Sequence, residues 1–252
     1  MILPKSGDAF HQLQLYHLLA AILDEKYLSC NLFFKGGSCA AMLGWLDRFS
    51  LDLDFDLATS AEKKVIVGKL LSIFRQLNLK VKKRTNETPF FVLAYPTKTG
   101  QRNTLKLGMV DQNPKANDYK AHYLADIDRF CLCQTRETMV ANKLVALIDR
   151  YEKHRTIAGR DVYDIHYFLS HGFHYKKAVI EERRKTKASI YFKELLEFIQ
   201  KKVTDRIIGE DLSYLLPYEK FKMIRKTLKT ETLLLLRQEI ERLLLDKELT
   251  LS

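Results

Sequence analysis

Apolar and acidic residues alternate without interruption from Leu51 to Leu57, where the sequence reads LDLDFDL. A period of two is typical of a β-strand with one buried face. The opposite face then carries only carboxylates, those of Asp52, Asp54 and Asp56. Residues two apart on a strand point the same way, with their Cα atoms about 6.5–7 Å apart. Two neighbouring carboxylates can therefore share one divalent cation.

The same analysis predicts the elements around this strand. The expected elements are helices over 8–27, 39–46 and from an N-cap at Ser60 to about Leu77, and strands over 31–35, 79–84, 90–95 and 103–111. This succession of helices and strands predicts a small α/β domain with a mixed sheet.

The pattern changes near residue 115. The sequence from 115 to 128 is typical of a connector, and RFCLC after it indicates one more short strand. From Thr135 onward almost all of the chain has helical character, with helices expected over 135–151, 160–171, 175–203 and 217–248. We therefore predict two domains, an α/β domain over 1–125 and an all-helical domain over 126–252.

Composition and charge narrow the class of protein. Hydrophobic residues make up 46% of the 252 residues and charged residues 29%, which is ordinary for a soluble globular protein. The formal net charge of +11 favours either a polyanionic partner such as nucleic acid or simply a soluble surface. No apolar run reaches the roughly 18–20 residues that span a bilayer, and the first residues lack a secretory pattern. We expect a cytoplasmic protein without a membrane partner.

A glycine turn precedes the acidic strand by about fourteen residues. Glycines between a strand and a helix let backbone N–H groups approach a phosphate, and a helix N-terminus adds a partial positive charge. Gly36, Gly37 and Ser38 occupy this position, while Asp52 and Asp54 offer oxygen ligands of the kind that Mg²⁺ prefers.

The acidic strand has two other interpretations, and the residues leave the first open and exclude the second. A row of acids can simply be a solvated face. A calcium-binding loop is excluded, because its sixth position would need glycine and is Leu57, and its twelfth would need glutamate and is Lys63.

The helical half carries a second group of charged residues. Lys143 and Arg150 are seven residues apart and lie nearly in line on one helix, and Asp161 and Asp164 share a face of the next. Taken alone, these residues would form a solvated basic stripe and an acid that suits the start of a helix.

Together these segments resemble a known family. KGGSCAAML followed by RFSLDLDFDL, and then K-x₆-R and R-D-x-x-D, is similar to the AbiEii-type nucleotidyltransferase toxins of type IV toxin–antitoxin and abortive-infection systems, which include the MenT toxins. The resemblance assigns the phosphate-binding turn to Gly37 and Ser38 with Gly36, and the metal pair to Asp52 and Asp54. It assigns the helical lysine to Lys143, with Arg150 as a second cation. It assigns the acid that follows in the sequence to Asp161, and the family's serine to Ser50.

The resemblance implies a Mg²⁺-dependent enzyme that transfers NMP from an NTP to an RNA acceptor, most simply the 3′ end of a tRNA. It also implies a cognate antitoxin protein as a partner. Basic segments at 80–84, 183–187 and 220–229 are candidate RNA contacts. The alternatives are an inactive relative that only binds NTP, or an enzyme that nucleotidylates a protein partner.

One position departs from the pattern of nucleotidyltransferases. A third carboxylate is expected on a neighbouring strand, where this chain has Gly108. Asp161 is our preferred substitute. Asp111 after a strand bulge is the second option, and a weaker metal site is the third.

Overall fold

Seven strands of the described residues form one mixed sheet, which is the framework of the candidate site. The computed structural model describes residues 2–85 and 87–249, with side chains up to residue 245. The strands are β1 (Leu32–Lys35), β2 (Asp52–Leu57), β3 (Lys80–Thr85), β4 (Phe90–Ala94), β5 (Thr104–Val110), β6 (Tyr119–Leu124) and β7 (Arg129–Gln134). Their order is β3-β4-β5-β2-β1-β7-β6, so β2 and β1 are central and β3 and β6 are edges.

The sheet is mixed because β2 pairs in parallel with β5, and β1 with β7. The remaining neighbours, β1 with β2, β3 with β4, β4 with β5 and β6 with β7, are antiparallel. The predicted mixed sheet is confirmed, and the strand predicted from the LDLDFDL alternation is present as β2.

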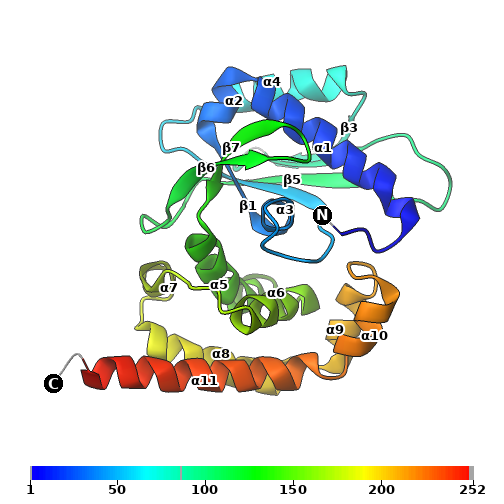
Figure 1. The fold of residues 1–252 in the computed structure, drawn as a ribbon. Coiled ribbons are helices and arrows are strands. Elements are labelled where there is room, and N and C mark those ends of the chain that lie inside the picture. The colour runs from blue at the N-terminus through cyan, green and yellow to red at the C-terminus, as the bar shows by residue number, and fades with distance from the viewer. Residues whose placement is uncertain (1, 86, 250–252) are drawn as a thin grey trace. The chain divides into compact units, whose positions relative to one another are not determined.

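Two long helices pack on one face of this sheet and give it a core. The helices of this half are a 3₁₀ turn (Ser6–Asp8), α1 (Ala9–Asp24), α2 (Lys26–Asn31), α3 (Gly36–Met42) and α4 (Lys63–Gln76). Figure 1 shows α1 and α4 running along the same side of the strands. Phe74 of α4 meets Phe91 of β4 with ring centroids 5.1 Å apart. Phe34 of β1 and Phe55 of β2 are in contact, with ring centroids 5.2 Å apart.

Several predicted boundaries are wrong for identifiable reasons. The helix expected over 8–27 breaks at Glu25, which is extended and accepts a hydrogen bond from the Leu28 N–H, so that it caps α2. The helix expected to start at Ser60 is capped at Glu62 instead. The connector expected over 115–128 is also wrong, because β6 forms an antiparallel hairpin with β7.

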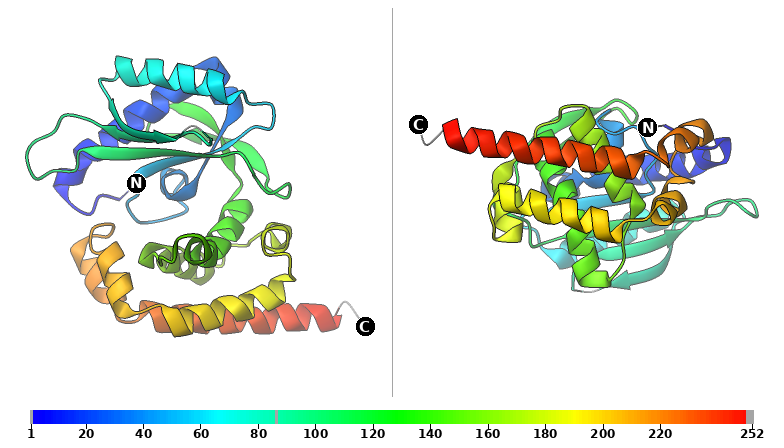
Figure 2. Two further views of the ribbon diagram at one scale, coloured as in Figure 1. Left: turned by 180° about the vertical axis from the view of Figure 1, so that it is seen from behind. Right: turned by 90° about the horizontal axis from the view of Figure 1, so that it is seen from below.

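The helical half is described separately. Its helices are α5 (Arg136–His154), α6 (Gly159–Ser170), α7 (Lys177–Arg184), α8 (Ala188–Lys202), α9 (Asp205–Leu212), α10 (Tyr218–Ile224) and α11 (Leu228–Leu249). The helix expected over 175–203 is two helices, because Lys185 adopts a left-handed backbone conformation and ends α7. The helix expected over 217–248 is likewise divided into α10 and α11, and α9 was not predicted. Figure 2 shows α8 and α11 lying side by side.

The Cα positions divide the chain into two compact units. One comprises residues 1–113 and 117–135, and the other comprises 114–116 and 136–252. The α/β unit therefore includes the whole β6–β7 hairpin, and the expected boundary between 125 and 126 falls in the turn of that hairpin. Within the described part of the chain, no helix combines the length and hydrophobicity needed to cross a membrane.

Candidate active site

The glycine turn forms the start of α3 and is tied to the acidic strand. The helix expected over 39–46 instead begins at Gly36 and ends at Met42. Gly36 has φ +79°, a left-handed conformation that favours glycine. The Ser38 hydroxyl donates a hydrogen bond to the backbone carbonyl of Asp52. Because a hydroxyl has a single hydrogen, Ser38 in this state can offer a phosphate its backbone N–H but not its O–H.

Asp54 lies between two glycines that leave room for its carboxylate. A Cβ on Gly36 would stand 2.8 Å from one oxygen of Asp54, and a Cβ on Gly108 would stand 3.0 Å from the other. The register explains this, since Asp54 is opposite Lys35 of β1 on one side and Gly108 of β5 on the other. The acid pair is partly exposed, and its donor chemistry fits a divalent cation held by one or two carboxylates.

Asp56 has a different role from the other two acids of β2. Its side chain is 1% exposed and is bound by Lys35. It also accepts hydrogen bonds from the Tyr119 hydroxyl at 2.9 Å and from Nε2 of Gln134 at 2.6 Å. Burial, and then the charge of Asp56, raise the pKa of Tyr119. Asp56 is therefore an internal anchor that joins β2 to β1, β6 and β7, and it is not a solvated acid.

Arg48 is a residue of this site that the sequence reasoning missed. Its side chain is buried, with 2% exposure, and Nη1 donates to the carbonyl of Phe49 at 2.9 Å. A Cβ on Gly37 would meet Nη2 of Arg48 at 3.0 Å and the hydroxyl of Ser50 at 2.9 Å. Arg48 and Ser50 thus pack directly against the second glycine of the turn. Arginine is rarely buried unless it has a partner, but burial is visible only in the folded chain.

The strand position at which nucleotidyltransferases would carry a third carboxylate lies next to the acids of β2 and is a glycine in this chain. Gly108 is the register partner of Asp54, so an acid there would point to the same face. Asp111 follows the end of β5 and is bound by Lys63 of α4. This hydrogen bond lowers the pKa of Asp111. Its carboxylate is thus already engaged outside the acid pair.

In the helical unit, the charged residues of the second motif form two ion pairs. Nζ of Lys143 lies 2.8 Å from Asp164, and Nε of Arg150 lies 2.9 Å from Asp161. Both carboxylates are buried, with 0% and 1% exposure. Asp161 lies in the first turn of α6. The structure therefore brings each predicted cation next to an acid: Lys143 pairs with Asp164, and Arg150 pairs with the predicted Asp161.

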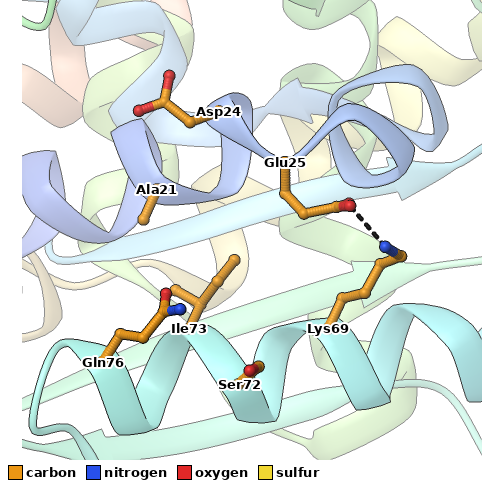
Figure 3. A pocket seen from close by; sticks show the side chains of 7 residues that line it. All are labelled: Ala21, Asp24, Glu25, Lys69, Ser72, Ile73 and Gln76. Carbon is orange, nitrogen blue, oxygen red and sulfur yellow. Dashed lines mark hydrogen bonds and ion pairs between the residues drawn. The ribbon is translucent and has the colours of Figure 1, made fainter.

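A separate open groove lies between α1 and α4 of the α/β unit. It has a volume of about 470 Å³, and Figure 3 shows Glu25 and Lys69 in it, joined by an ion pair of 2.5 Å. The residues that line it are Ala21, Asp24, Glu25, Lys69, Ser72, Ile73 and Gln76. None of the predicted site residues lines this groove.

The mixed sheet, the glycine turn and the paired acids of β2 agree with the class of protein predicted from the motifs, that of the nucleotidyltransferases. The family model of the nucleotidyl transferase AbiEii toxins of type IV toxin–antitoxin systems matches residues 17–244. The chain belongs to this AbiEii family, as the sequence motifs predicted.

Two solved structures, both from H. pylori, show the same fold at low sequence identity. A candidate nucleotidyltransferase from H. pylori is 18% identical, with a TM-score of 0.60, covering 95% of this chain and 98% of its own. JHP933 from Helicobacter pylori is 17% identical, with a TM-score of 0.58, covering 100% of both chains. MenT4, a nucleotidyltransferase toxin of Mycobacterium tuberculosis, is 17% identical, with a TM-score of 0.49, covering 94% of this chain and 91% of its own. No curated protein matches the sequence significantly.

Proposed function

We propose that this nucleotidyltransferase transfers a nucleoside monophosphate from an NTP to a hydroxyl group of RNA, at the 3′ end of a tRNA, and releases pyrophosphate. The observation that carries the proposal is the position of Asp54 and Asp52 on one face of β2, beside the glycine turn. The formal charge of +11 supports a polyanionic acceptor.

Asp52 and Asp54 would hold Mg²⁺. Among the described residues, no three or more His, Cys, Asp or Glu side chains are grouped to hold a metal ion. The proposed ligands are therefore a pair of carboxylates. Mg²⁺ usually takes one or two carboxylates together with substrate phosphates. When bound, the ion would supply charge neutralisation at the triphosphate.

The remaining residues bind and orient the substrates. Backbone N–H groups of Gly36, Gly37 and Ser38 contact the terminal phosphates. Ser50 supports that turn by packing against Gly37. Lys143 acts on the triphosphate as a point charge, with Arg150 as a second cation.

Asp161 would orient the attacking hydroxyl or accept its proton. Its buried ion pair with Arg150 fixes the carboxylate in one orientation, which such a role requires.

The family also supports a cognate antitoxin as protein partner. With NTP and tRNA as its substrates, the protein would act in the cytoplasm. We further propose that the helical part of the chain is a domain of its own. It is the second domain of the division into 1–125 and 126–252 that the sequence predicts.

The test is incubation of the protein with each α-labelled NTP, Mg²⁺ and total tRNA. We expect label in tRNA, and loss of that label when the terminal diol of the tRNA is first oxidised. Label on protein instead would favour protein nucleotidylation, and NTP binding without turnover would favour an inactive relative. Gly108 in place of a third carboxylate is the feature that favours the inactive relative.

A further inference from the structure

The strand register extends the face of the acid pair toward the β3 edge of the sheet. Asp52 is opposite Lys106 of β5, and Lys106 is opposite Val92 of β4. Val92 is in turn opposite Lys83 of β3. Paired residues on neighbouring strands point to the same face. Lys106 and Lys83 therefore stand in one row with Asp52.

A third lysine occupies the same face one pair further along. Lys80 of β3 is opposite Ala94 of β4, which is opposite Thr104 of β5. Lys80, Lys83 and Lys106 are all exposed. None of the three forms an ion pair with a carboxylate of the described residues. The face therefore carries three available positive charges on one side of the acid pair.

Some other basic groups of the chain are already engaged. On the opposite side of the acid pair, Lys35 is bound to Asp56. In the helical unit, Arg183 is bound to Asp149, and Arg184 to Asp149 and Glu152. Arg183 and Arg184 are thus paired with carboxylates, while the three lysines of the sheet face are not.

An aromatic ring adjoins the acids on this face. Phe90 of β4 is the register partner of Gly108, and its ring lies 3.8 Å from where a Cβ on Gly108 would stand. Phe90 is half-buried. Aromatic rings that stack bases, combined with cations that follow the backbone, are the usual means of binding single-stranded nucleic acid.

We propose that this face is the path of the single-stranded acceptor end of the RNA. Phe90 stacks a base next to Asp54, and Lys106, Lys83 and Lys80 contact successive phosphates toward the β3 edge. Strands lie about 4.8 Å apart, so Lys83 is about 14 Å from β2, a distance that a short single strand can cover. The choice of RNA rests on the proposed function.

Lysines on an edge strand also discourage edge-to-edge pairing of sheets. That role would account for Lys80 and Lys83, but not for Lys106, because β5 is an interior strand. Lys106 is therefore the most informative single position.

The test is fluorescence anisotropy with a short 5′-labelled single-stranded RNA, in EDTA without NTP, over a series of salt concentrations. The test variant is Lys80→Gln/Lys83→Gln/Lys106→Gln. The charge-matched control is Lys26→Gln/Lys64→Gln/Arg75→Gln, whose cations lie on α2 and α4.

We expect the test variant to bind at least tenfold more weakly, with a salt slope reduced by about 2, because each phosphate contact on a single strand contributes about 0.7. The control should stay near wild type, and Phe90→Leu should weaken binding about tenfold. Three results would contradict the proposed RNA path. These are equal losses of affinity in the two triple variants, unchanged binding in the test variant, and no binding by the wild-type protein.

Transfer measurements separate this proposal from the proposed function. If label enters RNA in the wild-type protein and equally in the test variant, the path is wrong and the function stands. If the binding results are as expected but no label enters RNA, the path stands and RNA is not the acceptor in transfer.

Discussion

Gly36 is the first residue of α3 and Gly44 follows the end of that helix, and both have a positive φ, of +79° and +71°. They differ in their surroundings. A Cβ on Gly36 would stand 2.8 Å from Asp54, whereas a Cβ on Gly44 would meet nothing within 4 Å. This makes Gly44 a matched control for the role of Gly36 in the candidate site.

We predict that Gly36→Ala and Gly44→Ala lower the free energy of unfolding by similar amounts, about 1 kcal/mol each for the backbone strain. Gly36→Ala alone should abolish nucleotidyl transfer, because the new methyl group displaces the Asp54 carboxylate. Urea unfolding and a transfer assay on both variants check this. Equal transfer activity in the two variants would show that the space at Gly36 is not needed.

Asp56 provides a second prediction at the scale of a residue. Removing its carboxylate by Asp56→Ala leaves Lys35, Tyr119 and Gln134 without their shared acceptor. Loss of one partner of a buried ion pair costs about 3–5 kcal/mol. Urea unfolding followed by the fluorescence of Trp45, the single tryptophan, measures this in the α/β unit. A loss below about 1 kcal/mol would mean that the network contributes no more than a surface ion pair.

Single residues also show which features of the site could not be predicted from the sequence. The alternation around β2 correctly predicted that Asp52 and Asp54 share a face, but it gave Asp56 the same solvated character. Which carboxylate is buried depends on Tyr119 and Gln134, more than sixty positions away. Similarly, the pairing of Lys143 with Asp164 depends on how α5 packs on α6, which the spacing of charges does not determine.

At the scale of elements, α1 is joined to the start of β2 by a buried histidine. Nε2 of His11 donates to the carbonyl of Leu51 at 3.0 Å, and Nδ1 lies 2.5 Å from the Tyr95 hydroxyl, from which it accepts. Both ring nitrogens are satisfied in the neutral form. Burial lowers the pKa of His11 to about 4.

This pKa predicts the pH dependence of stability. The unfolded histidine, with its ordinary pKa of about 6.5, binds a proton more readily than the folded one, so stability falls as pH drops from 6.5 toward 4. At pH 5 the α/β unit should be about 2 kcal/mol less stable than at pH 7 from this residue. Urea unfolding at both pH values, followed by Trp45, measures the difference. If His11→Gln retains the full difference, the histidine is not its source.

The elements themselves were predicted to different degrees. Strands β2, β4 and β5 were predicted because each buries alternate or consecutive apolar residues. The strand β6 was missed because YKAHYL lies at the sheet edge, where most of its residues are not buried and no alternation results. The break after α7 was missed because Lys185 takes a left-handed conformation without a glycine or proline to mark it.

At the scale of the whole molecule, the family motifs are distributed over both compact units of the chain. We predict that Lys143→Gln lowers the transfer rate at least 100-fold, because a point charge on the triphosphate is lost. Lys193→Gln, an exposed lysine of α8 in the same unit, serves as the control. Steady-state transfer with varied NTP measures both. Equal rates in Lys143→Gln and wild type would remove Lys143 from the site.

The central claim is that Asp52 and Asp54 hold a divalent cation against the triphosphate beside the glycine turn. Calorimetric titration with non-hydrolysable analogues of the four NTPs, in Mg²⁺ and in EDTA, tests it most directly. For at least one analogue, we predict Mg²⁺-dependent binding that is at least tenfold weaker in Asp52→Asn and in Asp54→Asn. Binding should be unchanged in Asp128→Asn, which alters a carboxylate of the β6–β7 turn. Equal affinity in all four proteins, or binding that persists in EDTA, would contradict the claim.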